Sequence, residues 1–190
     1  MANDYGEISY EVRDNVAWLT LERPEVKNAF REQTLDEIAE AANSTREDPT
    51  IAALVISGSG GAFSAGGDFH AMMKLNKANS YMWNDRMMKV AMTLRNLPIP
   101  VIAMVEGPCV GGGHELMLWC DLVITAEDAT FGQTGARVGA CPTVGATQYI
   151  AKLIGERRAK EMIFLCKTYT GKEAAEIGLA NIAVPAEELR

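Results

Sequence analysis

The chain has 190 residues, of which 48% are hydrophobic, and its formal net charge is −7. This length and composition suit a single globular domain spanning residues 1–190, and they exclude a largely disordered chain. Acidic residues outnumber basic ones and no dense basic run occurs, so we expect no nucleic-acid partner.

The N-terminus carries neither the basic region nor the apolar region of an export signal. The long apolar stretch at 101–126 is interrupted by Glu106, Glu115 and Asp121, which would be costly in lipid. The sequence therefore predicts a soluble cytoplasmic protein with no membrane contact. Four cysteines lie in mostly apolar surroundings without metal-site spacing, and we expect them to be reduced core thiols with no metal bound. They are Cys109, Cys120, Cys141 and Cys166.

The first predicted elements form a strand, helix and strand unit. Residues 7–13 alternate and residues 15–21 are rich in strand formers, which predicts a hairpin. Apolar residues recur at helical spacing over 35–42. Residues 51–57 form a continuous apolar run that suits a buried parallel strand.

A methionine-rich helix is predicted at 80–97, ended by prolines at 98 and 100, with its methionines filling the core. Further along, we expect a strand, a glycine turn, a helix, a strand, a longer helical region, a shorter helix and a last strand. Their expected ranges are 101–105, 107–113, 114–120, 122–125, 145–166, 171–177 and 181–184.

Two glycine clusters stand out from the rest of the chain. Residues 62–69 read Ala-Phe-Ser-Ala-Gly-Gly-Asp-Phe, where small residues allow the backbone to approach a ligand. Residues 106–116 read Glu-Gly-Pro-Cys-Val-Gly-Gly-Gly-His-Glu-Leu and place three glycines before an apolar helix. Free N–H groups there suit an anion, but the Gly-Lys-Ser/Thr ending of a nucleotide loop is absent.

In this order, the two clusters resemble those of the enoyl-CoA hydratase/isomerase (crotonase) superfamily. Other matching positions cover nearly the whole chain: Arg23-Pro24, Asn28-Ala29, Cys120-Asp121, Phe131-Gly132-Gln133, Thr147-Gln148 and residues 174–180. The resemblance implies an α/β fold, a spiral of β-β-α units, that assembles as a homotrimer or a dimer of trimers. It also implies a C-terminal helical region, which we expect to be missing because the sequence stops at Arg190.

By the same resemblance, the backbone N–H groups of Gly67 and Gly112 form an oxyanion hole for the thioester oxygen. An enolate gathers negative charge on that oxygen, and losing one preorganised donor typically costs about 3–4 kcal/mol. Glu115 matches the first of two catalytic glutamates in the hydratases, which makes it an acid/base candidate. The alternative for Glu115 is a helix-terminal glutamate that favours the helix dipole. His114 beside it is expected to be structural.

The resemblance also places the substrate's coenzyme A around the first glycine loop. The residues that would contact it are Ala65, Gly66, Asp68 and Phe69. Lys27 would lie near the nucleotide phosphates, although an ordinary solvated lysine is an equal alternative.

The chain departs from the hydratases at Gly135, which occupies the place of their second glutamate. The Gln133-Thr134-Gly135 sequence is similar to that of dihydroxynaphthoyl-CoA synthases and 2-ketocyclohexanecarboxyl-CoA hydrolases. In that branch, this segment can hold a bicarbonate that acts as base, so Gln133 and Gly135 would contact substrate or bicarbonate. The branch's catalytic serine and aspartate are replaced here by Ala140 and Pro142.

The leading hypothesis is an acyl-CoA lyase or isomerase with Glu115 as its single acid/base. It would act on an acyl-CoA thioester and need no tightly bound cofactor, because coenzyme A arrives as part of the substrate. One alternative is an enzyme that forms or opens rings on a cyclic β-keto acyl-CoA. Another is a non-catalytic paralogue that serves in assembly or RNA binding.

Overall fold

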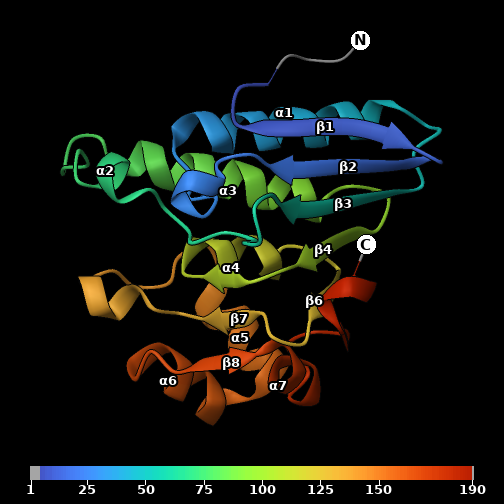
Figure 1. Ribbon diagram of the computed structural model, residues 1–190. Coiled ribbons are helices and arrows are strands. Elements are labelled where there is room, and N and C mark those ends of the chain that lie inside the picture. Colours follow the sequence, from blue (N-terminus) through green and yellow to red (C-terminus); the bar gives the residue numbers. More distant parts are fainter. Residues whose placement is uncertain (1–4, 190) are drawn as a thin grey trace.

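The computed structural model describes residues 5–189, which form an α/β fold with two sheets (Figure 1). The larger sheet has the order β1-β2-β3-β4-β6-β9 and the smaller one the order β5-β7-β8. The strands are β1 (Ile8–Arg13), β2 (Val16–Leu21), β3 (Ala53–Gly58), β4 (Val101–Val105), β5 (Pro108–Val110), β6 (Leu122–Ala126), β7 (Thr130–Gly132), β8 (Thr168–Thr170) and β9 (Ile182–Val184).

Seven α-helices connect or cover the strands within the described part of the chain. They are α1 (Glu32–Glu47), α2 (Phe69–Met72), α3 (Ser80–Arg95), α4 (Gly112–Leu118), α5 (Ala146–Ile154), α6 (Glu156–Phe164) and α7 (Gly171–Glu176). None of the helices within 5–189 combines the length and apolar character needed to cross a bilayer.

The predicted hairpin at the start of the chain is confirmed. β1 and β2 pair antiparallel, and Asp14 and Asn15 between them have φ angles of 49° and 63°. Two successive left-handed residues are typical of a tight hairpin turn, and Asp and Asn tolerate that region well. From β2 onward the pairing in the larger sheet is parallel.

Helices α1 and α3 contact each other and lie along one side of the first strands (Figure 1). The apolar positions predicted for α1, Leu35, Ile38, Ala39 and Ala42, are all buried. Their spacing places them on one face, which packs against β1 and β2. The predicted core of this half therefore forms as expected.

The glycine segment at 107–113 is more ordered than the turn that was predicted. β5 (Pro108–Val110) lies inside it, and α4 already begins at Gly112. The three-residue strands β5, β7 and β8 were not predicted, because so short a segment has little periodicity to detect; β9, which has the same length, was expected at 181–184 and forms there. The helical pattern at 145–166 is likewise two helices, because Gly155 separates α5 from α6 with a φ of 80°.

The expectation that the α3 methionines fill the core was wrong for most of them. Met87 is buried, whereas Met82, Met88 and Met92 are exposed. Three of the four cysteines are buried as predicted, but Cys141 is exposed because it lies in the irregular stretch after Gly139. The trimeric assembly implied by the resemblance stays a prediction.

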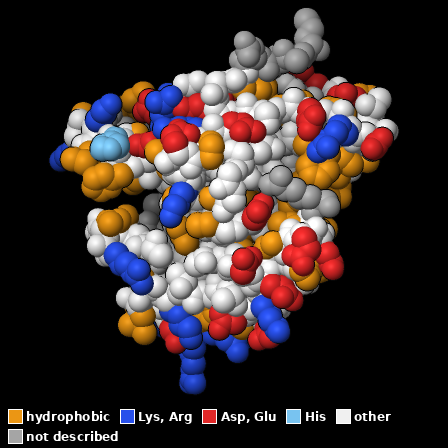
Figure 2. Space-filling model, viewed as in Figure 1, with side chains coloured by type: hydrophobic (Ala, Val, Ile, Leu, Met, Phe, Trp, Pro, Cys, Tyr) orange, Lys and Arg blue, Asp and Glu red, His pale blue; other side chains and the backbone are white. Residues whose placement is uncertain are grey.

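Charged side chains of both signs are scattered over the face shown in Figure 2. Lys and Arg do not gather there into a large patch of one sign. This distribution agrees with the acidic balance of the sequence.

Candidate active site

The two glycine segments meet because the first of them extends the smaller sheet. The Ser64 N–H donates to the carbonyl of Pro108 at 2.9 Å, and the Val110 N–H donates to the carbonyl of Ser64 at 3.0 Å. Ser64 therefore runs parallel to β5. This pairing carries the chain beyond Ser64 towards the start of α4.

Gly66 and Gly112 lie in direct backbone contact. A Cβ added to Gly66 would lie 2.6 Å from the nitrogen of Gly112, and the φ of Gly66 is +92°. A Cβ added to Gly112 would lie 3.4 Å from the nitrogen of Gly67. Only glycine at 66 satisfies both the backbone angle and the space, so this contact explains the first cluster.

The N–H groups of Gly67 and Gly112 share this neighbourhood. Within residues 5–189, Gly67 N–H has no hydrogen-bond acceptor. Gly112 is the first residue of α4, where N–H groups lack a partner inside the helix. Two backbone donors are thus available close together.

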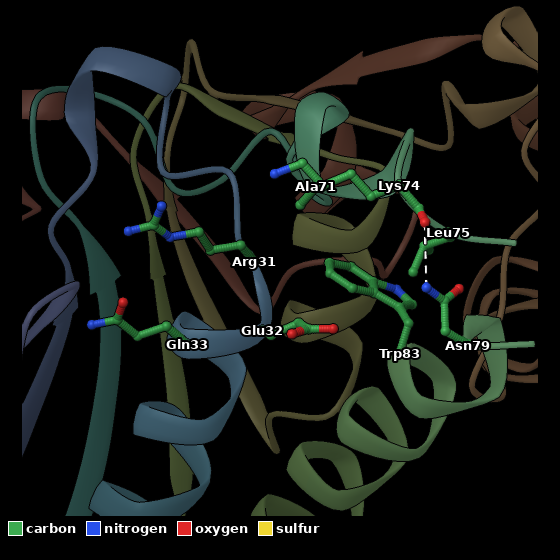
Figure 3. Close-up of a pocket in the computed structure, with 8 residues that line it drawn as sticks. All are labelled: Arg31, Glu32, Gln33, Ala71, Lys74, Leu75, Asn79 and Trp83. Carbon is green, nitrogen blue, oxygen red and sulfur yellow. Dashed lines mark hydrogen bonds between the residues drawn. The ribbon is translucent and has the colours of Figure 1, made fainter.

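Apolar side chains surround these donors. A Cβ added to Gly67 would contact the side chains of Met72 and Trp83. A Cβ added to Gly112 would lie 3.0 Å from the Phe30 ring. Trp83 also lines a cavity of ≈ 340 Å³ between the start of α1 and the chain around α2 (Figure 3). The other lining residues are Arg31, Glu32, Gln33, Ala71, Lys74, Leu75 and Asn79.

Glu115 lies in the first turn of α4 and is only 4% exposed. Its Oε1 accepts a hydrogen bond from the Thr143 N–H at 2.7 Å, and Oε2 accepts one from Thr143 Oγ1 at 3.3 Å. Burial raises the pKa of Glu115 to about 7, and the bonds from Thr143 offset only part of that rise. A carboxyl group in this state can both take up and release a proton near neutral pH.

His114 points into the core, as predicted for a structural residue, and is fully buried. Its Nδ1 lies 3.2 Å from Nε2 of Gln133, and the same amide nitrogen donates to the carbonyl of Gly111 at 3.3 Å. Burial lowers the pKa of His114 to about 3, so the ring is neutral. Gln133 is itself 2% exposed, with its amide directed at these two partners.

Gly135 begins a short 3-10 helix, Gly135–Val138, beyond β7. A Cβ added there would lie 3.1 Å from the carbonyl oxygen of Ala140. The chain then continues to Thr143, whose bonds to Glu115 connect this segment to α4. The segment 131–143 contains no Asp or Glu.

The proposed coenzyme A contacts surround the first cluster. Ala65 N–H donates to the carbonyl of Lys27 at 2.9 Å, which places exposed Lys27 beside the loop. Asp68 caps α2 by accepting from Ala71 N–H at 3.1 Å and pairs with Arg23 at 3.0 Å. Asp68 therefore orders the loop. Phe69 is exposed at the start of α2, and Figure 2 shows a recess below this region.

Four residues of this neighbourhood were missed in the sequence: Thr143, Phe30, Met72 and Trp83. Thr143 lies one position beyond Pro142, within a segment already singled out, but a hydroxyl and an N–H aimed at Glu115 leave no sequence signal. Trp83 lies in the predicted helix at 80–97, whereas Met72 lies in α2, which was not predicted, and Phe30 lies just before α1; nothing in the sequence marks them as neighbours of Gly67 or Gly112. Their positions follow from tertiary packing alone.

A family model described as enoyl-CoA hydratase/isomerase matches residues 11–190. The structure of DspI from Pseudomonas aeruginosa is similar, with a TM-score of 0.94, 30% identity and coverage of 99% of this chain and 77% of that one. An enoyl-CoA hydratase from Bacillus anthracis gives 0.92 and 31%, covering 97% and 72%. An enoyl-CoA hydratase/isomerase from Xanthobacter autotrophicus Py2 gives 0.92 and 35%, covering 97% and 69%.

These similarities extend over nearly the whole chain, and they confirm the crotonase fold expected from the two glycine clusters. They give no support to the dihydroxynaphthoyl-CoA synthase branch that the Gln133-Thr134-Gly135 sequence suggested. The chain belongs to the enoyl-CoA hydratase/isomerase (crotonase) superfamily and is an enzyme of that superfamily.

Proposed function

We propose that the protein is an acyl-CoA lyase or isomerase that stabilises a thioester enolate and moves protons with Glu115. One observation carries this proposal: the start of helix α4 holds both the buried Glu115 carboxyl, whose pKa is near 7, and the free N–H of Gly112. Gly112 and Glu115 are three residues apart at the start of α4, so donor and acid/base would act on adjacent atoms of one substrate.

The two glycine N–H groups would bind the thioester oxygen. Removing a proton next to a thioester carbonyl drives negative charge onto that oxygen, where fixed donors are most effective. The contact between Gly66 and Gly112 keeps the two donors near each other without any side chain between them. Met72, Trp83 and Phe30 would exclude water from this region and strengthen the interaction.

Glu115 would act alone as acid and base. Its pKa near 7 means that both protonation states are populated at neutral pH. Residues 131–143 supply no carboxylate, and Gly135 stands where the resemblance places the second glutamate. Without that second carboxylate, the site is less suited to activating a water molecule than to returning to the substrate the proton that Glu115 has removed. Transfer of a proton between two carbons of the acyl group therefore suits this site better than hydration.

The coenzyme A portion would follow the loop from Ala65 to Phe69, with Lys27 available to its phosphates. The Ala65 N–H donates a hydrogen bond to the carbonyl of Lys27, and this bond holds the Lys27 backbone close to the loop. No cofactor beyond the substrate's own coenzyme A is required for this chemistry.

A pair of substitutions at Gly112 tests the proposal. Gly112→Pro removes the N–H at the first position of a helix, where proline is well tolerated. Gly112→Ala adds a Cβ at the same point near Phe30 but keeps the N–H. Each protein is assayed with a 3-enoyl-CoA for isomerisation and with crotonyl-CoA for hydration.

We expect kcat to fall by about 10²–10³ in Gly112→Pro, the usual effect of losing one oxyanion donor, and far less in Gly112→Ala. Circular dichroism verifies that both variants are folded. Equal activity of the folded proline and alanine variants would remove the Gly112 N–H from the mechanism. Faster hydration than isomerisation by the parent would overturn the single acid/base assignment.

A further inference from the structure

One peptide unit in the site carries two groups with different tasks. It joins Gly111 to Gly112, so it contains the carbonyl of Gly111 and the N–H of Gly112. No cis peptide bond occurs within residues 5–189, and in a trans unit the carbonyl and the N–H point in opposite directions. Whatever holds the Gly111 carbonyl therefore sets the direction of the Gly112 N–H.

The backbone itself does little to fix this plane. Gly111 has φ 54° and ψ −125°, a conformation open to glycine and strained for other residues. A Cβ added to Gly111 would meet only the carbonyl of Ala65, at 3.8 Å, so packing is loose here. With glycine on both sides, rotation of the plane is restrained mainly by its hydrogen bonds.

Two donors hold the Gly111 carbonyl. The first is the Glu115 N–H at 3.0 Å, an ordinary bond of the helix. The second is Nε2 of Gln133 at 3.3 Å, from a residue that directly follows β7. Gly111 N–H donates in turn to the carbonyl of Gly132 at 3.0 Å, which fixes Gln133 opposite Gly111. Gln133 is thus the side chain that orients this peptide.

His114 completes the arrangement by orienting the Gln133 amide. The Gly111 carbonyl can only accept, so the atom facing it is the amide nitrogen, and the second N–H of that group faces Nδ1 of His114 at 3.2 Å. Nδ1 must then be the acceptor, which places the ring proton on Nε2. A neutral ring agrees with the lowering of the His114 pKa by burial.

This arrangement has a cost that packing alone does not explain. Within residues 5–189, Nε2 of His114 has no hydrogen-bond partner although it is buried. An unsatisfied buried donor costs about 1–3 kcal/mol, which an apolar residue of similar size would avoid. A buried polar group with such a cost is expected where it contributes to a functional site.

We infer that Gln133 and His114 are positioning residues that hold the Gly111–Gly112 peptide so that its N–H points at the thioester oxygen. This inference rests on the proposed function. The bond to the Gly111 carbonyl also polarises the peptide and makes the Gly112 N–H a stronger donor to developing charge. Gln133 acts through this peptide.

The first test is Gln133→Met, which keeps the length of the side chain but removes its donors. With the substrate that the parent turns over, kcat falls at least about tenfold, up to the 10²–10³ known for losing an oxyanion donor, while KM changes less than about threefold. Thr45→Val is the matched control, because Thr45 is buried in α1 and donates to the Ala41 carbonyl at 2.9 Å. The Thr45 hydroxyl also lies 3.0 Å from the Tyr10 hydroxyl, so this variant loses two hydrogen bonds, as Gln133→Met does, and keeps the parent's kcat.

His114 is tested by rescue. His114→Leu removes the acceptor and lowers kcat as Gln133→Met does, whereas His114→Asn offers Oδ1 near the place of Nδ1 and restores most of the loss. The double variant with Gln133→Met and His114→Leu is no slower than the worse single variant, because both act on one peptide. Acetoacetyl-CoA provides an optical readout, since its enolate form absorbs in the ultraviolet. Gln133→Met binds it but no longer favours the enolate.

An unchanged kcat in folded Gln133→Met, or an equal loss in Thr45→Val, overturns the inference. If Gln133→Met does not fold, Gln133→Asn keeps the amide but withdraws it from the Gly111 carbonyl, and the same kinetics are expected. The two proposals fail separately. Full activity of Gly112→Pro sinks the proposed function, whereas an enzyme that needs the Gly112 N–H but tolerates Gln133→Met refutes only the positioning role.

Discussion

Glu115→Gln separates the catalytic and structural consequences of one buried carboxyl. Glutamine has the same size, and its amide can keep both contacts with Thr143, one as acceptor from the N–H and one as donor to Oγ1. The titrating proton is the main loss. We expect kcat to fall by about 10²–10⁴, the usual range for acid/base catalysis, with little change in acyl-CoA binding.

The same substitution should stabilise the protein above neutral pH. The pKa of Glu115 is about 7 in the folded protein against an ordinary 4.5, because burial penalises the charged form. Between pH 4.5 and 7 the folded state binds more protons than the unfolded state, so the stability of the parent falls as pH rises. At 1.36 kcal/mol for each pH unit, the loss above pH 7 is roughly 3 kcal/mol.

Glutamine does not titrate, so the variant escapes this loss. Urea unfolding at pH 8 should show Glu115→Gln more stable than the parent by up to ~3 kcal/mol, or roughly 6–12 °C in Tm for a chain of this size. At pH 5 the difference should shrink to about 1 kcal/mol or less. A difference that is equal at the two pH values would refute the raised pKa, and an unchanged kcat would refute the acid/base role.

Two other substitutions probe the substrate site. Gly135→Glu should raise crotonyl-CoA hydration at least about tenfold, by restoring a second carboxylate where the new Cβ needs only a small adjustment of Ala140; a folded variant with no gain would contradict this. Lys27→Gln should raise the KM of acyl-CoA by about two- to fivefold at low salt and less at high salt, as measured by steady-state kinetics in a salt series. A KM that does not change at low salt would leave Lys27 as an ordinary solvated lysine.

The larger sheet could be predicted well from the sequence because its signals are local. Alternation in the first hairpin, helical spacing in α1 and the apolar runs of β3 and β4 each span five or more residues. The smaller sheet could not, because β5, β7 and β8 lie outside the apolar and alternating runs that predicted strands and form only when distant segments pair; β9 is equally short but was expected at 181–184. The sequence therefore predicted a glycine turn where β5 forms, and it indicated no element at all for β7 and β8.

The candidate site divides in the same way. Gly67, Gly112 and Glu115 carry a sequence pattern, and the structure places the two glycine segments against each other. A substrate contact of Gln133 stays a prediction; what the sequence did not indicate is that its amide nitrogen is directed at Gly111 and His114. Side-chain direction after a three-residue strand depends on its pairing, which the local sequence does not encode.

The smaller sheet connects the two parts of the site, the oxyanion donors and the Glu115 carboxyl. β5 aligns Ser64 and so brings Gly67 to Gly112, while β7 delivers Gln133 to the peptide that precedes Gly112. The chain beyond β7 then reaches Glu115 through Thr143. Donor geometry and carboxyl pKa thus both depend on residues 131–143, outside the two glycine clusters. Because one short segment touches both functions, substitutions within it can change the reaction while the clusters stay intact.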